Sequence, residues 1–336
     1  MKKDMISMIV PCYNVEKFIE DCVKSIDAQT YKNFEVIFIN DGSKDGTLEL
    51  LKKLCAGKEN YIVLDQENAG QSVARNRGVE VSNGEFICFC DSDDIVSPFA
   101  LETLHTMIVQ TNADIAVYRP KWIKEEAAYD KMKFKRKELN AKVFESADTL
   151  VSMLYYGKLG YGPCNKLYRK SILQKMEGYP NVFNTKSHYG EDTEFVTMYL
   201  SISEKLAFSK QKLYLYRQRK GSVVHSKFNE RKLSVFNGLD RAEALDDEKF
   251  KNAKVYIKGR RATIALEMLF RMSRTDYRKK EVIQKLYNDY KHNVKYLTKG
   301  RKNPGYMRAF MPLVLPVLKL MFFKYLKKDK KIKKAK

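Results

Sequence analysis

Hydrophobic residues follow two alternating patterns over the first 120 positions of the chain. Short, continuous apolar runs of strand length alternate with stretches in which apolar side chains recur every three or four residues, as they do on one face of a helix. The expected strands are 6–13, 34–39, 61–64, 85–90 and 114–118, and the expected helices are 15–26, 48–55, 70–81 and 97–110. This alternation predicts an α/β fold in which βαβ units form a mainly parallel sheet with helices on both faces.

Polar residues stand at the carboxyl end of each of the first four expected strands. They are Asn14, Asp41, Asp65 and the run Asp91, Ser92, Asp93 and Asp94. In open α/β sheets, ligands bind in the crevice beyond the carboxyl ends of the strands. The repeated placement of polar side chains at one edge therefore predicts a binding site there.

The remaining chain carries weaker patterns. Residues 121–142 are charged and aperiodic, so we expect a linker or an excursion from the fold. Residues 150–156 and 171–176 are expected to be helical, and Gly190 precedes another helical run. Beyond residue 236 the pattern predicts helices rich in Lys and Arg, which form a separate C-terminal helical region.

Two explanations fit the acidic run that begins at Asp91. Two carboxylates at the end of a strand can turn toward one point, and such hard oxygen ligands suit Mg²⁺ or Mn²⁺, which then binds substrate phosphates at its open positions. Alternatively, an aspartate caps a helix that starts near Ser97 and Pro98. The run alone does not separate the two explanations.

Four segments at the strand–helix junctions together resemble the family 2 glycosyltransferases. In chain order they are VPCYNVEKFIEDCVKSI, FEVIFINDGSKDGT, NAGQSVARNRGV and GEFICFCDSDD. Family 2 glycosyltransferases are bacterial inverting enzymes with the A-type nucleotide-sugar fold. The resemblance is close over about residues 5–120 and continues loosely to about residue 228 through YGEDTEF and YRQRKGSVVHS. It implies a catalytic domain at 1–230, with a donor-binding half at 1–120 and an acceptor half at 143–230, followed by a basic helical region at 231–336.

The resemblance also implies a role for each polar cluster. The residues that would bind the nucleotide of the donor are Pro11, Tyr13, Asn14, Asp41, Arg75, Asp91 and Ser92. Asp91 and Asp93 correspond to the D-x-D motif and would hold the metal, Mn²⁺ or Mg²⁺, with His225 as a further candidate ligand or else a structural histidine. Arg217 and Arg219 are candidates for neutralising the diphosphate. For Asn76 and Gly78, capping and close packing of a helix on a strand remain alternatives to a role in the site.

Glu191 and Asp192 form the second acidic site. By resemblance Asp192 is the catalytic base, and Glu191 orients the acceptor or the base. A simple helix N-cap is the alternative, because the pair precedes an apolar helical run.

The implied function is transfer of a sugar, with inversion, from a nucleotide diphosphate donor, expected to be a UDP-sugar, to an acceptor hydroxyl. The expected acceptor is a glycan or a lipid-linked glycan in bacterial cell-surface polysaccharide synthesis. No Q-x-x-R-W sequence is present and the single Trp is Trp122, which argues for single transfers rather than processive polymerisation. The alternatives are a sugar-nucleotide pyrophosphorylase, which would need a Gly-rich loop at 11–15, and a membrane-binding protein without catalytic activity.

Basic residues are concentrated at the C-terminal end. Residues 251–336 contain 26 Lys and Arg against 5 Asp and Glu, whereas residues 1–250 are almost neutral. The apolar stretch 306–326 is interrupted by prolines and basic residues, so it is too short for a membrane span and suits the surface of an anionic membrane. A solvated tail is the alternative, and no motif supports specific nucleic-acid binding.

The cysteines and the beginning of the chain bear on the compartment. The six cysteines sit mostly in apolar runs, without zinc-like spacing to His, so we expect reduced structural thiols. No signal-peptide pattern precedes the first strand. We therefore expect a cytoplasmic protein, peripheral on the inner face of the cell membrane.

Overall fold

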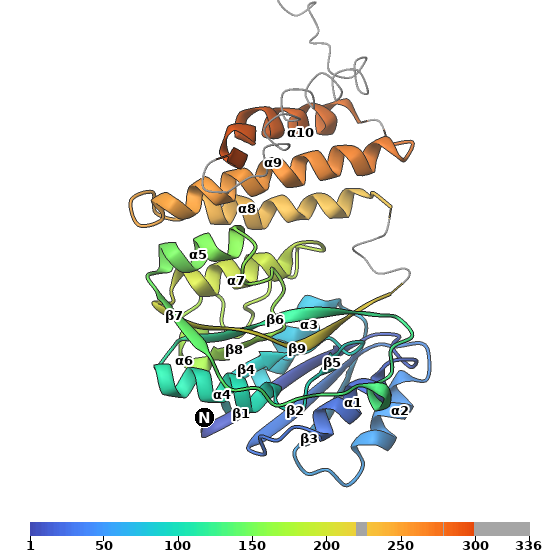
Figure 1. Ribbon diagram of the computed structural model, residues 1–336. Helices are drawn as coiled ribbons and strands as arrows, with labels where there is room; N and C mark the ends of the chain where they lie inside the picture. Colours follow the sequence, from blue (N-terminus) through green and yellow to red (C-terminus); the bar gives the residue numbers. More distant parts are fainter. Residues whose placement is uncertain (220–226, 278, 299–336) are drawn as a thin grey trace, which may run out of the picture.

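The computed structural model describes residues 1–219, 227–277 and 279–298 (Figure 1). The first part of the chain forms β1 (Lys2–Cys12), α1 (Ile19–Asp27), β2 (Phe34–Asp41), α2 (Thr47–Cys55), β3 (Tyr61–Gln66), α3 (Gln71–Val81), β4 (Gly84–Phe89), β5 (Ile95–Val96), α4 (Ala100–Thr111) and β6 (Ile115–Lys124). There follow η1 (Tyr129–Lys131), β7 (Ala141–Glu145), α5 (Ala147–Tyr155), β8 (Lys166–Arg169), α6 (Lys170–Leu173), α7 (Glu191–Ser201) and β9 (Lys205–Gln218). The last elements are η3 (Glu230–Ser234), α8 (Val235–Glu243), α9 (Lys251–Ser273), α10 (Lys280–Asn293) and η4 (Val294–Thr298).

The described strands form one nine-stranded sheet in the order β3-β2-β1-β4-β8-β6-β9-β5, with β7 paired to β9. The strands β3, β2, β1 and β4 are mutually parallel, as the alternating pattern predicts. Beyond β4 the sheet is mixed, because β8 runs antiparallel to both β4 and β6, whereas β6 and β9 are parallel. The α/β fold is therefore confirmed, and its parallel part consists of β1 to β4.

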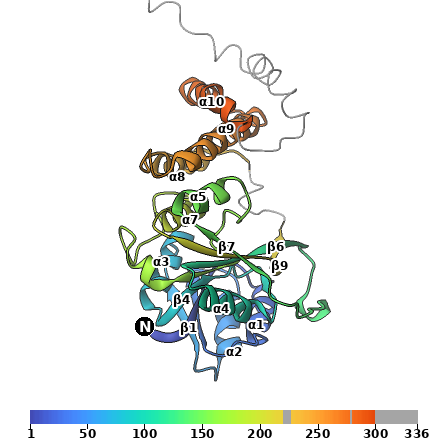
Figure 2. The ribbon, with the colours of Figure 1, turned by 60° about the vertical axis from the view of Figure 1, so that its left-hand side comes forward.

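Helices cover both faces of this sheet, which explains the continuous apolar runs. All eight residues of β2 are buried, as expected for a strand between two helical layers. Helices α1, α2 and α4 lie on one face, and α3, α5 and α7 lie on the other (Figures 1 and 2). Gly78 of α3 lies against the sheet, where an added Cβ would be 2.4 Å from Ile9 Cγ2. Close packing of the helix on the sheet thus accounts for this glycine.

The C-terminal helices α8, α9 and α10 form a further layer on top of α5 and α7 (Figures 1 and 2). Helix α9 packs on α5, α8 and α10. Its first turn is fixed to α5, because Asn252 Nδ2 and the Ala253 amide each donate a hydrogen bond of 2.7 Å to the Asp148 carboxylate. The predicted C-terminal helical region is present, and it rests directly on the rest of the fold.

Some expectations need correction. Residues 121–142 are not simply a linker, because β6 extends through Lys124 alongside β9 and β7 starts at Ala141. The helix expected at 171–176 is the four-residue α6. Within the described part of the chain, no helix combines the length and apolar character needed to cross a membrane. The apolar stretch 306–326 lies outside the described residues, and all six cysteines are buried.

Candidate active site

A cavity of about 740 Å³ opens at the carboxyl ends of the parallel strands and extends beneath the C-terminal helices. Three parts of the chain form its walls. The sheet edge provides Pro11, Tyr13, Asp41, Asp91, Ser92 and Asp93, and α5, α7 and nearby loops provide Tyr155, Tyr161, His188, Tyr189, Glu191, Asp192 and Glu194. The segment from the end of β9 to α9 provides Arg219, Val235, Leu239, Arg260 and Ile264. The structure thus brings together most of the predicted site residues. Asn14 and Arg75 do not line the cavity, and His225 lies outside the described residues.

Asp41 organises the loop that leads into α3. Its buried carboxylate accepts hydrogen bonds of 2.9 Å from the amides of Ala69 and Gly70, and one of 2.8 Å from Gln66 Nε2. Gly70 adopts a φ of +93°, which a residue with a side chain rarely adopts. Asp41 therefore shapes one wall of the cavity from within the sheet edge.

Asn14 joins two loops instead of facing the cavity. Its backbone amide donates to Ser43 Oγ at 3.0 Å, and its side-chain Oδ1 accepts from the backbone amide of Lys44 at 2.8 Å. One oxygen of the side chain is engaged by this loop contact and Asn14 does not line the cavity, so its role in nucleotide binding stays a prediction. Its neighbour Tyr13 is 46% exposed and lines the cavity.

The acidic run does not cap a helix. Helix α4 has Phe99 as its N-cap residue and no side-chain cap bond. Instead the run is anchored from β9: the Asp91 amide donates to Tyr214 Oη at 3.0 Å, and Asp94 Oδ1 accepts from the Arg217 amide at 2.7 Å. The capping alternative for this run is therefore wrong.

The carboxylates of this run crowd one another. Burial, followed by the charge of Asp91, raises the pKa of Asp93, and burial followed by the charges of Asp93 and Asp91 raises that of Asp94 well above its usual range. Asp94 Oδ2 is buried and has no hydrogen-bond partner among the described residues. A divalent cation would relieve this repulsion, so the oxygen donors fit Mg²⁺ or Mn²⁺. The described residues contain no cluster of three or more Asp, Glu, His or Cys side chains placed to hold a metal.

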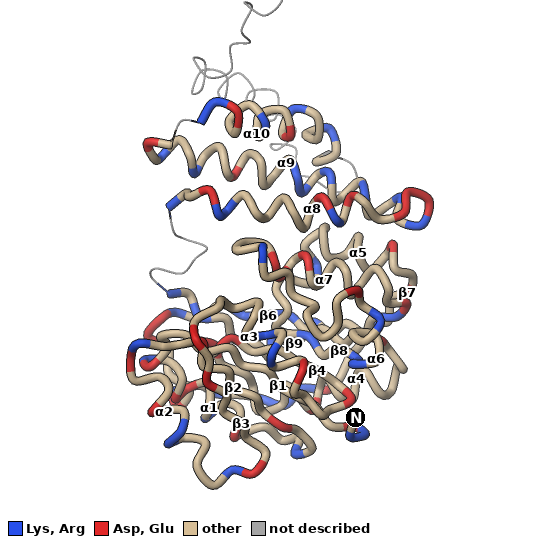
Figure 3. The backbone as a smooth tube through the Cα atoms, turned by 180° about the vertical axis from the view of Figure 1, so that it is seen from behind, with Lys and Arg blue, Asp and Glu red and all other residues tan. Residues whose placement is uncertain are grey.

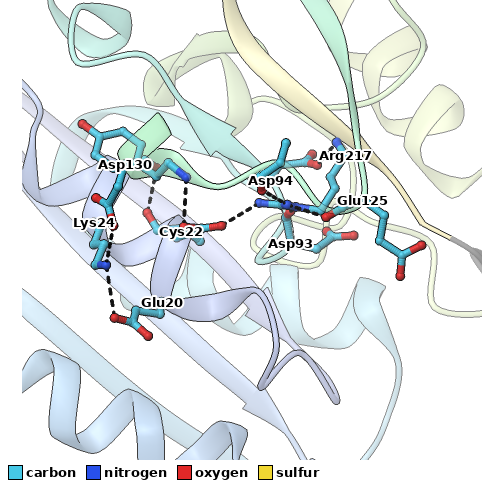
Figure 4. A network of polar contacts seen from close by, with 12 residues as sticks. Glu20, Cys22, Lys24, Asp93, Asp94, Glu125, Asp130 and Arg217 are labelled. Atoms are coloured by element: carbon cyan, nitrogen blue, oxygen red, sulfur yellow. Dashed lines mark hydrogen bonds and ion pairs between the residues drawn. The ribbon is translucent and has the colours of Figure 1, made fainter. Parts of the chain in front are cut away.

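Arg217 supports the acidic run and also lines the cavity. Its side chain is buried and donates to the carbonyl oxygens of Asp93 and Glu125, at 2.7 Å each, and to Asp21 Oδ2 at 3.0 Å (Figure 4). These contacts engage the guanidinium, and the role of Arg217 in neutralising a diphosphate stays a prediction. Arg219 also reaches the cavity, where its Nε lies 2.5 Å from Asp93 Oδ2.

Arg75 connects the two acidic sites. The side chain is completely buried, with Nη2 3.0 Å from Asp91 Oδ1 and Nη1 2.5 Å from Asp192 Oδ1. Its guanidinium also lies over the Phe183 ring, 5.3 Å from the ring centre. One cation thus fixes the distance between the end of β4 and the first turn of α7.

Glu191 and Asp192 occupy the first turn of α7 behind Gly190, and neither makes a side-chain cap bond. Burial, with the adjacent charge of Asp192, raises the pKa of Glu191 to about 7. Burial also raises the pKa of Asp192, while Arg75 opposes that rise. The Asp192 side chain remains 32% exposed toward the cavity. A carboxylate that is desolvated, held in place and open to the cavity can accept a proton from a bound hydroxyl.

Sequence reasoning left the role of Asn76 open and missed several residues of the cavity wall. Asn76 fixes the loop before α7, because its side chain exchanges hydrogen bonds with the Phe183 backbone at 2.9 and 2.8 Å. Arg260 and Ile264 reach the cavity from α9, a helix placed outside the catalytic part by the resemblance. Their four-residue spacing indicates a shared helix face, but no pattern in the sequence shows what that face covers.

The fold and the acidic clusters define a nucleotide-sugar transferase architecture, and comparison with known proteins identifies the family. The model of glycosyl transferase family 2 matches residues 7–177, just over half of the chain, so the protein belongs to that family. Glycosyltransferase GlyA of Streptococcus pneumoniae is 33% identical over 231 residues, which span 66% of this chain but only 31% of GlyA. Glycosyltransferase GlyG of the same species is 29% identical over 233 residues, spanning 67% of this chain and 75% of GlyG.

The fold extends the similarity to almost the whole chain. Residues 1–349 of Staphylococcus aureus TarS, crystallised in complex with UDP-GlcNAc, superpose with a TM-score of 0.69. The match covers 96% of this chain and 89% of that one at 21% sequence identity. The A-type glycosyltransferase fold is thereby confirmed, including the helices that follow β9.

Proposed function

We propose that this chain is an inverting glycosyltransferase that moves a sugar from a UDP-sugar to an acceptor hydroxyl, with Asp192 as the general base. The observation that carries the proposal is the Arg75 bridge, which holds Asp91 and Asp192 in one cavity. Direct displacement at the anomeric carbon needs a leaving diphosphate on one side and a proton acceptor on the other. Two acidic sites at a fixed separation meet that need.

The donor side of the proposed site consists of Asp41, Tyr13 and the acidic run. Asp91 and Asp93 would hold Mn²⁺ or Mg²⁺, and Arg219 would approach the same phosphates. When bound, the metal supplies Lewis-acid stabilisation of the charge that develops on the leaving diphosphate. A nucleotide carrying uracil is the first donor to test, since the TarS fold has been crystallised with UDP-GlcNAc.

On the acceptor side, Asp192 takes the proton of the attacking hydroxyl. Arg75 holds its Oδ1, which leaves Oδ2 as the oxygen to accept the proton. Glu191, next to it and similarly desolvated, orients the hydroxyl or the base. The acceptor would belong to a bacterial cell-surface polysaccharide or a lipid-linked glycan.

The test uses Asp192→Asn, Asp91→Asn and, as a matched surface control, Asp130→Asn. Asp192→Asn should keep Mn²⁺-dependent UDP binding, measured by calorimetry, and lose about 10²- to 10⁴-fold in transfer rate, since that is the usual contribution of a general base. Asp91→Asn should weaken UDP binding in Mn²⁺, and Asp130→Asn should match the wild type. Retention of most of the transfer activity by Asp192→Asn would contradict the assignment of the base.

We also propose a peripheral location on the inner face of the cell membrane, from the basic C-terminal sequence. Along α9 and α10, Lys and Arg are frequent (Figure 3), and basic residues near an anionic surface contribute on the order of 1 kcal/mol each. The full-length chain should sediment with vesicles containing anionic lipid and be released by salt. Equal sedimentation with neutral vesicles would overturn this part of the proposal.

A further inference from the structure

One face of α9 forms a wall of the cavity and continues beyond it. Tyr256, Arg260 and Ile264 follow one another at four-residue spacing and so share that face. Arg260 and Ile264 line the cavity. Tyr256 lies further out, edge-on to Tyr156 at the end of α5, with the ring centres 5.7 Å apart. Tyr156 and Tyr256 thus meet beside this wall of the cavity, where α5 and α9 pack together (Figure 2).

Cations and tyrosine rings alternate along this junction. The Arg260 guanidinium lies over the Tyr161 ring, 4.5 Å from its centre, and Lys158 Nζ lies 5.0 Å from the centre of the Tyr156 ring. Tyr161 is itself fixed, because its hydroxyl donates to the Tyr155 carbonyl oxygen at 3.3 Å. We call Lys158, Tyr156, Tyr256, Arg260 and Tyr161 the cation–tyrosine strip.

The loop that carries Lys158 and Tyr161 is held from inside the fold. The buried Lys166 Nζ donates to the carbonyl oxygens of Gly160 and Gly162 at 3.1 and 2.6 Å, and burial lowers the pKa of Lys166 to about 7. A loop fixed in this way does not have to be ordered when a ligand arrives, so binding costs less conformational entropy.

Arg260 differs from the other arginines that line the cavity. Arg219 is paired with Asp93, and Arg217 is saturated by backbone oxygens and Asp21. Arg260 has no carboxylate or hydrogen-bond partner among the described residues. Because its flat face rests on a tyrosine, its N–H groups remain available at the edge, where a guanidinium binds phosphate or carboxylate in a two-pronged manner.

Arg260 lines the same cavity as Glu191 and Asp192. Its stacking partner Tyr161 lies in the loop after α5, within the proposed acceptor half of the chain, so we place Arg260 on the acceptor side of the cavity.

We infer that the acceptor is an anionic chain, bearing phosphate or carboxylate groups, and that Arg260 and the cation–tyrosine strip bind it as it enters the cavity. This inference rests on the proposed function, since it assigns the acceptor of the same site. The tyrosine rings offer flat surfaces for sugar or polyol units, and the cations neutralise the charges between those units.

The test measures binding to the full-length chain with UDP and Mn²⁺ at saturation, so that anions do not enter the donor side. The probes are a short oligo(glycerol phosphate), a short oligogalacturonate and a neutral malto-oligosaccharide of similar length. The wild type should bind at least one anionic probe more tightly than the neutral one. Arg260→Gln should weaken that binding by about 10-fold or more, because it removes a charge-assisted hydrogen bond. The phosphate and carboxylate arms tell which anion is recognised.

Arg274→Gln is the matched control, since Arg274 is exposed at the end of the same helix. It should bind all three probes as the wild type does, and Arg260→Gln should still bind UDP with Mn²⁺. Tighter or equal binding of the malto-oligosaccharide by the wild type, or equal weakening by the two Gln variants, would overturn the inference. Absence of Mn²⁺-dependent UDP binding in the wild type would instead contradict the proposed function.

Discussion

Replacing Arg75 with Gln removes the single cation that joins the two acidic sites. Arg75 is fully buried, whereas the side chains of Asp91 and Asp192 are 24% and 32% exposed. Breaking a buried ion pair from one side typically costs about 3–5 kcal/mol. Because water reaches both carboxylates, we expect the lower end, about 3 kcal/mol. A domain with a typical stability of about 5–15 kcal/mol remains folded after such a loss.

The same substitution should change the pH dependence of transfer. Arg75 opposes the rise that burial imposes on the pKa of Asp192. Without Arg75 the pKa of Asp192 is higher, so the base is protonated over a wider range and the acid limb of kcat/KM moves to higher pH. Arg75→Lys should be intermediate, because one ammonium group cannot contact both carboxylates at the distances that the guanidinium reaches.

Urea unfolding monitored by circular dichroism and the pH profile of kcat/KM measure the two effects. The control is Arg77→Gln, two positions along α3, where the side chain donates to the Asp65 carbonyl oxygen at 2.9 Å and touches neither acidic site. Its pH profile should match that of the wild type. If Arg75→Gln left both the urea midpoint and the acid limb unchanged, the bridge would have no energetic role.

Two further substitutions test the packing and the electrostatics of the site. Gly78→Ala places a Cβ 2.4 Å from Ile9 Cγ2 and should lower the free energy of unfolding by about 1–3 kcal/mol. The control Gly162→Ala has open space around its Cβ and should change the free energy of unfolding by less than about 0.5 kcal/mol. Equal urea midpoints for the two variants would refute the packing argument. The pKa of Glu191 is about 7 in the folded chain against 4.5 ordinarily, so its contribution to stability is full below pH 4.5 and is lost as the pH rises to 7. Glu191→Gln should therefore gain stability relative to the wild type across that interval and hold the gain above it, and a pH-independent difference between the two would contradict the raised pKa.

The sequence was sufficient to predict the parallel half of the sheet and the residues at its edge. Strands such as β2 are buried on both faces, and a predominantly apolar run has few other ways to fold. Asp41 ends β2, and Asp91 and Asp93 come shortly after β4, so their common location comes from local sequence and sheet topology. Resemblance was needed to single out Asp192, which follows no strand.

Long-range contacts explain what the sequence could not predict. Arg217 lies on β9 and Arg219 just beyond its end, yet the first is engaged by backbone oxygens and the second pairs with Asp93. Likewise, β6 continues past residue 120 through charged sequence because β9 runs beside it, and pairing of backbone groups requires no apolar pattern. The approach of Arg260 to the cavity depends on how α9 packs on α5, which composition does not encode.

The Arg75 bridge has a consequence for how the chain tolerates insertions and deletions. Arg75 and Asp192 are 117 residues apart in sequence, and their contact passes through space. The loops between α3 and α7 can therefore differ in length without displacing the proposed base Asp192, provided that both helices keep their positions on the sheet. The match to the family model ends at residue 177, before Asp192, whereas Arg75, which holds Asp192, lies inside the matched part. The position of Asp192 thus depends on a residue from the part of the chain that matches the family model.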